Sequence, residues 1–103
     1  MSDYPVPDLA DVDLVGILRA LADPVRLRIL HVLADGLPHP KTEGEWELEV
    51  HKSTLSHHFK TLREAGLTRT VVEGRTHTIQ LRREELDARF PGLLDSVIAA
   101  SGA

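Results

Sequence analysis

The chain has 103 residues, 42% of them hydrophobic, which is enough for one compact core but hardly for two. It contains no cysteine, which excludes disulfides, thiolate metal sites and thiol redox sensing. No apolar run approaches the roughly 20 residues of a membrane span, and the N-terminus MSDYPVPDLAD is acidic, unlike a signal peptide. We therefore expect a single cytoplasmic domain, 1–103, with no membrane partner.

The net charge of −4 is unevenly distributed. Residues 1–51 carry 4 Lys/Arg against 10 Asp/Glu, residues 52–83 carry 7 against 2, and residues 84–103 carry 1 against 4. Phosphate binding depends on local charge, because screening acts over a Debye length of about 8 Å at physiological salt. The basic block at 52–83 fits either a nucleic-acid surface or a solvated basic face.

A loose arm at residues 1–8 precedes the first predicted helix, which runs from Leu9 or Val12 to Ala22. Asp8 or Asp11 is its expected cap. Its buried stripe comprises Leu14, Ile17, Leu18 and Leu21. Apolar side chains outside this stripe indicate either a wide core face or a dimer interface; they are Val12, Val15 and Ala20.

A second helix is predicted to begin after Asp23, its N-cap, with Pro24 at the first helical position, where the missing N–H costs nothing. It ends at Gly36. Its core side comprises Leu27, Leu30, Leu33 and Ala34. We expect His31 to be packed or half-exposed and not a ligand.

Residues 42–50 fit two structures. Thr42-Glu43-Gly44-Glu45 matches a capping box, which favours a short helical turn ending near Trp46. The alternation of Trp46, Leu48 and Val50 with glutamates also fits a short, half-buried strand. We favour the helical turn, with Trp46 as a core anchor, because it completes a helix-turn-helix directly before Ser53.

The stretch KSTLSHHFKTLREAGL at 52–67 predicts a recognition helix over 53–66 with two unlike faces. Ser53 is the expected N-cap, and Gly66 suits a left-handed C-terminal residue. The buried stripe comprises Leu55, Phe59 and Leu62, with His58 packed beside it. The opposite face carries side chains suited to base edges and phosphates, namely Ser53, Ser56, His57 and Lys60.

After Gly66 the sequence period changes to two, and β-branched residues predict a hairpin over 67–81 that turns at Gly74. A hairpin directly after a recognition helix is typical of the wing of a winged helix. Arg75 at its tip, helped by Arg69 and His77, is placed to reach phosphates or a minor groove. The alternative is an edge hairpin whose charges only prevent aggregation.

The tail at 84–100 predicts helices that Pro91 kinks or divides. Its apolar stripe comprises Leu86, Phe90, Leu94 and Val97. Such a stripe has little left to cover within one small domain, so we expect it to pair with the first helix of a second copy. The predicted dimer interface comprises Leu14, Leu18, Phe90, Leu94 and Val97.

Two separated motifs, LADPVRLRIL at 21–30 and STLSHHFK followed by LREAGL at 53–67, carry a family resemblance. At this spacing the chain resembles the ArsR/SmtB family of bacterial winged-helix repressors. The resemblance implies a mainly α winged helix-turn-helix with a β-hairpin wing, and a homodimer, joined through its first and last helices, that represses at a palindromic DNA operator. It also implies that Ser53, Ser56 and His57 face bases, that Lys60 and Arg75 hold phosphates, and that Thr54 is a weaker candidate.

Many members of that family sense metals through cysteine pairs, or through Asp and His residues on the last helix. This chain has no cysteine and no histidine in its predicted last helix, and the adjacent His57 and His58 point about 100° apart on a helix. We therefore predict no metal ligand and no cofactor. A metal-responsive site between subunits, built from His39 or His51 and nearby glutamates, stays open as an alternative.

An enzyme and a protein-binding module are two further classes of function. Ser56 beside His57 is not an activated nucleophile, because neighbours on a helix project apart and a triad requires convergence in space. The chain is therefore not predicted to be an enzyme. A winged-helix module that binds a protein is the alternative to DNA binding, although the basic block favours DNA. No residue pattern points to an effector.

Overall fold

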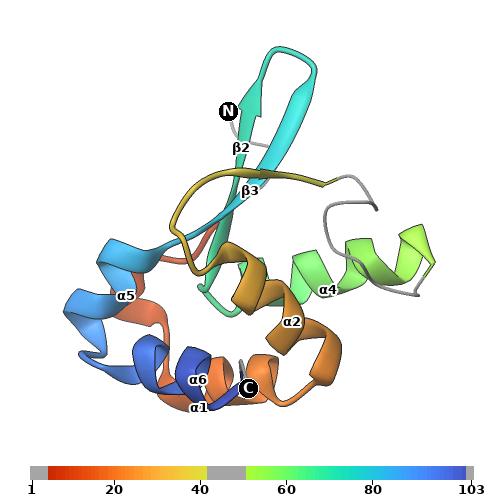
Figure 1. Cartoon of the computed structure of the whole chain (residues 1–103). Helices are drawn as coiled ribbons and strands as arrows, with labels where there is room; N and C mark the ends of the chain where they lie inside the picture. Colours follow the sequence, from red (N-terminus) through yellow and green to blue (C-terminus); the bar gives the residue numbers. More distant parts are fainter. Residues whose placement is uncertain (1–4, 42–50, 102–103) are drawn as a thin grey trace.

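The computed structural model describes residues 5–41 and 51–101. Along these ranges the elements are the 3-10 turn η1 (Leu9–Asp11), helices α1 (Leu14–Leu21) and α2 (Pro24–Leu33), strand β1 (His39–Pro40), helix α4 (Lys52–Glu64), strands β2 (Thr68–Glu73) and β3 (Thr76–Leu81), and helices α5 (Arg83–Arg89) and α6 (Leu93–Ser101). The β2–β3 hairpin projects from the helices, and α1 and α6 lie at the opposite end (Figure 1). This is the predicted winged helix-turn-helix, mainly helical with a β-hairpin wing.

The sheet is antiparallel, with strand order β1-β3-β2. Thr68 pairs with Leu81 and Thr70 with Ile79, and the hairpin turns at Gly74, whose φ of 62° suits a glycine. The hairpin was predicted, but β1 was not. A two-residue strand that contains a proline has no periodicity to recognise, and its pairing of His39 with Ile79 joins segments 40 residues apart.

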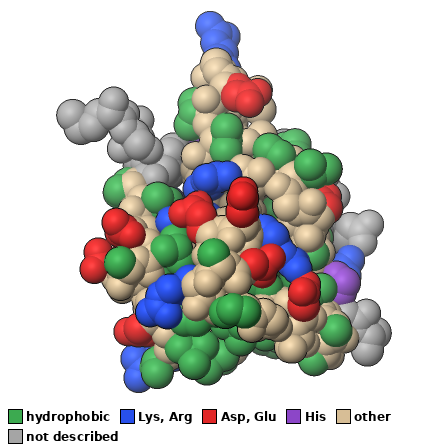
Figure 2. Space-filling view, turned by 90° about the vertical axis from the view of Figure 1, so that its left-hand side faces the viewer, with side chains coloured by type: hydrophobic (Ala, Val, Ile, Leu, Met, Phe, Trp, Pro, Cys, Tyr) green, Lys and Arg blue, Asp and Glu red, His purple; other side chains and the backbone are tan. Residues whose placement is uncertain are grey.

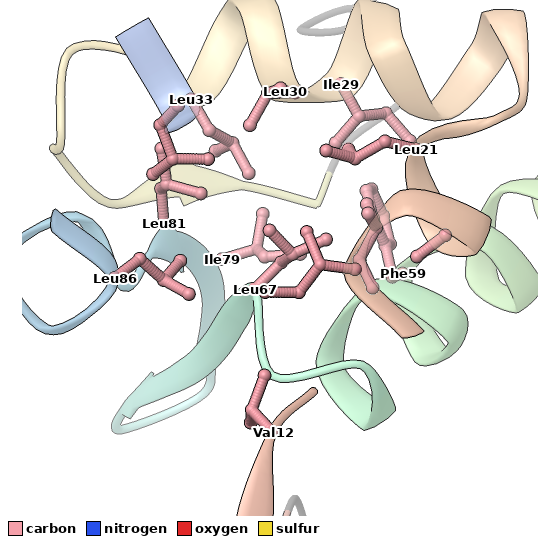
Figure 3. Packing of buried hydrophobic residues seen from close by; sticks show 14 of the residues in the cluster. Val12, Leu21, Ile29, Leu30, Leu33, Phe59, Leu67, Ile79, Leu81 and Leu86 are labelled. Atoms are coloured by element: carbon pink, nitrogen blue, oxygen red, sulfur yellow. The ribbon is translucent and has the colours of Figure 1, made fainter. Parts of the chain in front are cut away.

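The core lies between α2 and the layer formed by α4 and the base of the hairpin. In Figure 3, Ile29 and Leu30 of α2 face Phe59, Leu67 and Ile79 from across the core. The same cluster includes buried side chains from α1 and both tail helices. It therefore connects the recognition helix, the wing and the terminal helices.

The first predicted helix is two elements. Asp8 caps η1 by accepting from the amide of Ala10, and Asp13 caps α1 by accepting from the amide of Gly16. The predicted burial of Leu14 and Leu18 is wrong, because they are 44% and 46% exposed. Ile17 and Leu21 are buried as predicted, and the other two core positions belong to Val12 and Ala20. Ile17, Ala20 and Leu21 share one helical face, which turns Leu14 and Leu18 to the side.

The second helix follows its predicted signals. Asp23 accepts hydrogen bonds from the amides of Val25 and Arg26, Pro24 opens the helix, and Gly36 with φ 76° follows its end. The predicted core face needs one correction. Its buried residues are Ile29, Leu30 and Leu33, whereas Leu27 and Ala34 are half-buried.

The tail forms two helices on either side of Pro91, as predicted. Leu86 and Leu94 are each only 1% exposed, and α6 packs against α2. The expectation that this stripe has little to cover within one chain is therefore wrong for these two residues. Phe90 and Val97 pack against the same core and are half-buried.

The choice between a helical turn and a strand at 42–50, with Trp46 as an anchor, lies outside the described residues. Among the residues that the structure describes, no helix has the length and apolar character needed to cross a membrane.

Candidate nucleic-acid interface

Helix α4 has the two faces that its sequence predicts. Leu55, Phe59 and Leu62 are buried in the core. The helix begins at Lys52, however, and its N-cap is His51, whose backbone is extended and whose carbonyl accepts from the amide of Leu55 at 2.9 Å. Ser53 is therefore not the cap. It lies in the first turn with its side chain exposed.

The predicted DNA-facing residues of α4 are all exposed; they are Ser53, Thr54, Ser56, His57 and Lys60. Lys52, which was not among the predicted contacts, shares their exposure. Lys52, Ser56 and Lys60 follow each other at intervals of four and so lie along one side of the helix. This spacing was readable in the sequence and could have identified Lys52.

A groove of about 710 Å³ separates α4 from the outer part of the hairpin. Leu55, Phe59 and Ser56 contribute to its wall, and no carboxylate is among its described lining residues. Its basic and histidine side chains come from α4, the hairpin and the segment after β1; they are Lys41, Lys52, Lys60, Arg63, Arg75 and His77. This combination of apolar wall and clustered cations suits a phosphodiester strand.

Lys41 shows how closely positive charges crowd in this groove. Burial, and next the nearby charge of Arg63, hold the pKa of Lys41 below its ordinary value of 10.5. Its Nζ lies 5.8 Å from the centroid of the Phe59 ring, within range of a cation–π interaction. Lys41 and Arg63 were not predicted. Only the short strand β1 carries Lys41 to α4, so nothing in the sequence near Lys41 indicates this position.

The structure brings Lys60, Ser56 and Arg75 together but places Arg69 elsewhere. Arg75 follows Gly74 in the exposed turn of the hairpin, and Figure 2 shows a Lys or Arg side chain at the end of the projecting hairpin. The Nε of Arg69 donates to Gln80 Oε1 at 3.2 Å, and its Nη1 lies 3.6 Å from Glu85 Oε1. Arg69 therefore sits at the base of the hairpin, beside α5 and outside the groove.

An apolar surface lies at the other end of the molecule. Leu14, Val15 and Leu18 of α1 are exposed, and Leu14 borders a shallow hollow shared with Phe90 and Leu93. Figure 2 shows hydrophobic side chains gathered at the lower edge, where α1 and α6 lie in Figure 1. Of the predicted interface residues, Leu14 and Leu18 are thus exposed on α1, and Phe90 lies beside Leu14 at the hollow. Leu94, in contrast, is a core residue.

His39, one of the histidines considered for a metal site between subunits, is held by Asp35. Its Nε2 lies 2.9 Å from Asp35 Oδ1 and 3.0 Å from Oδ2, and this hydrogen bond contributes to a lowered pKa of Asp35, against the opposing effect of burial. Across residues 5–41 and 51–101, no three His, Asp or Glu side chains are grouped closely enough to hold a metal ion.

A model of a helix-turn-helix domain matches residues 21–71. Over 82 residues the chain is 39% identical to YceK of Bacillus subtilis, an uncharacterized HTH-type transcriptional regulator, with 79% of this chain and 82% of that protein covered. It is 40% identical to the HTH-type transcriptional regulator CmtR of Mycobacterium tuberculosis, over 80% of this chain and 68% of that protein. It is 37% identical to the arsenical resistance operon repressor of Staphylococcus xylosus, over 73% of this chain and 71% of that protein. The chain belongs to the ArsR/SmtB family of helix-turn-helix transcriptional regulators.

Proposed function

We propose that this protein represses transcription by binding a palindromic DNA operator as a homodimer. The observation that carries the proposal is the basic groove between α4 and the hairpin, which places Lys52, Lys60 and Arg75 around one channel. In this arrangement α4 enters a major groove and the neighbouring phosphate strand follows the channel. A relative named as an arsenical resistance operon repressor supports repression.

The base-reading face is the exposed N-terminal half of α4, of which Ser56 also contributes to the wall of the groove. Ser53, Ser56 and His57 present short donors and acceptors that match base edges, with Thr54 as a weaker contact. Lys60 and Arg75 hold phosphates and so set the register of the helix on the duplex. Arg69 would assist only from the base of the hairpin.

The homodimer is supported by the exposed apolar side chains of α1. An apolar surface made by Leu14, Val15 and Leu18 beside the hollow at Phe90 is costly to leave in water, and a second copy is a self-complementary cover for it. Two copies related by a two-fold axis present two α4 helices, which would match the two half-sites of a palindromic operator.

Because the chain has no cysteine, a thiolate metal site does not control it.

The operator is tested by selecting duplexes from a random-sequence library with the purified protein. We expect an enriched sequence with dyad symmetry and two half-sites. On the selected duplex, Lys60→Ala should reduce the slope of log affinity against log salt by about 1, because one phosphate contact is lost. Lys60→Arg, which keeps the charge, should retain the slope.

Arg28→Ala is the matched control, because Arg28 is an exposed cation of α2 that does not line the groove. It should leave the slope unchanged. If Lys60→Ala leaves the slope unchanged, as Arg28→Ala should, Lys60 does not contact a phosphate. If no duplex is enriched at low salt, the surface serves another partner, such as a protein.

A further inference from the structure

The side chain of Arg26 lies where α1, α2 and α4 meet. It extends from the first turn of α2, and only 15% of it is exposed. Its Nε donates to the carbonyl oxygen of Ala20 on α1, and its Nη1 lies 4.0 Å from Asp23 Oδ2. The same Nη1 lies 3.1 Å from Nδ1 of His58 on α4. One guanidinium group thus connects α1, the cap of α2 and α4.

The partners of Arg26 determine the chemical state of His58. A guanidinium group can only donate, so Nδ1 of His58 must accept, which makes the ring neutral with its proton on Nε2. A proton on Nδ1 would set two donors against each other and place a second cation beside Arg26. His58 is only 7% exposed, so water is poorly placed to replace the lost hydrogen bond.

The surroundings of His58 favour the neutral ring. Burial is the largest cause that lowers the pKa of His58 below its ordinary value of 6.5, and Arg26 and His57 lower it further. Asp23, the acidic cap of α2, opposes them. The ring of His57 on the same helix has its centroid 6.0 Å from that of His58. Burial and the positive charge of Arg26 on α2 therefore act against protonation of His58.

We propose that Arg26 is a positioning residue for DNA binding, which holds α4 against α2 through a neutral His58 and loosens that hold when the ring is protonated. The inference rests on the proposed function. Neither side chain lines the basic groove. They act from the buried side of the helix turn that presents Ser56, His57 and Lys60 on its exposed side, so they set the orientation of the DNA-facing residues.

The test compares wild type with His58→Asn on the selected duplex at about pH 7.5 and at an acid pH below the folded-state pKa of His58, which the NMR titration of wild type described below supplies. The Asn oxygen occupies the place of Nδ1 and accepts from Arg26, but it does not titrate in this range. We expect wild type to lose roughly tenfold more affinity than His58→Asn on acidification, which is the effect of losing one hydrogen bond to a charged group. Both proteins keep every other titratable side chain, so the comparison concerns the side chain at position 58.

Arg26→Lys supplies the second arm at about pH 7.5. A compact ammonium cannot reach both Ala20 and His58 as a planar fork does, so affinity should fall roughly tenfold while the far-ultraviolet spectrum stays that of a folded protein. The His58 ring signals in an NMR titration of wild type should show a pKa below the ordinary value, whether or not DNA is present.

Three results would overturn the inference: equal pH dependence in wild type and His58→Asn, unchanged affinity in Arg26→Lys, or a His58 ring that titrates at or above its ordinary value. The NMR arm requires no DNA and reports the protonation state of His58 in intact wild type, even where a variant fails to fold. If wild type binds no duplex at either pH, the proposed function fails, and the ring titration still decides the state of His58.

Discussion

Replacing Gly66 by alanine tests how the recognition helix is joined to the N-terminal segment. Gly66 follows α4 with φ +90°, and a Cβ there would overlap Cγ2 of Val12 and lie 3.2 Å from its Cγ1. Val12 is only 5% exposed, so its side chain is enclosed by the core. An alanine must therefore adopt a left-handed backbone and also displace a buried valine.

The two costs can be separated by a control at the hairpin turn. A left-handed alanine costs about 1–2 kcal/mol, and overpacking a core costs roughly 1–3 kcal/mol more. Gly74 also has a positive φ, of 62°, but a Cβ there meets no described atom within 4 Å, so Gly74→Ala should show the first cost alone. Because 1 kcal/mol corresponds to about 4–8 °C at this size, Gly66→Ala should melt roughly 5–20 °C below Gly74→Ala.

Urea and thermal unfolding of both variants at one protein concentration provide the assay, since the stability of a dimer depends on concentration. Val12→Ala, made in wild type and in Gly66→Ala, reports the contact directly. The valine truncation should destabilise wild type by about 2 kcal/mol and cost clearly less in the Gly66→Ala background, where the added methyl group already crowds the site. Equal losses for Gly66→Ala and Gly74→Ala, or additive effects of Val12→Ala, would refute the proposed contact.

Three further predictions concern the dimer, the wing and the tail. Leu14→Glu should sediment as a folded monomer, because Leu14 is 44% exposed and a charge there disturbs only the dimer interface. Leu94→Glu should fail to fold, because Leu94 is only 1% exposed. A folded dimer of Leu14→Glu would exclude Leu14 from the interface. Arg75→Ala should lower the salt slope of operator binding by about 1, and Arg69→Ala by less, because Arg69 pairs with Glu85; the reverse order would contradict this placement. The hydrogen bond from Arg82 is the largest cause that holds the pKa of Glu85 below its ordinary value of 4.5. Glu85 therefore stabilises the fold fully above about pH 4.5, and this stabilisation is lost as the pH falls through the lower folded-state pKa. Urea unfolding at neutral and acid pH should show that Glu85→Gln removes this part of the pH dependence.

The sequence by itself determined the elements whose signals are local. Asp23 and Pro24 mark the start of α2, and the apolar spacing of Leu55, Phe59 and Leu62 shows which face of α4 is buried. The hairpin follows from β-branched residues around Gly74, whose turn needs a positive φ. Caps, periodicity and turns act between residues a few positions apart, so short stretches of sequence record most of them, although the N-caps of α1 and α4 proved to be Asp13 and His51.

Tertiary structure decided which apolar residues the core takes and which it leaves outside. Leu14, Leu18 and Leu94 have similar local patterns, yet only Leu94 is buried, because α6 packs against α2. Such a choice depends on how whole helices fit together, and no short window of sequence records it.

Tertiary structure also decided which residues surround each charged side chain. Strand pairing carries Lys41 into the groove, and a contact across 32 residues joins Arg26 to His58. Arg69 and Arg75 both belong to the basic hairpin, but Arg69 lies beside Glu85, whereas Arg75 lies at the free end of the hairpin. Chain segments distant in sequence meet at each of these places, and their electrostatic environment exists only after folding.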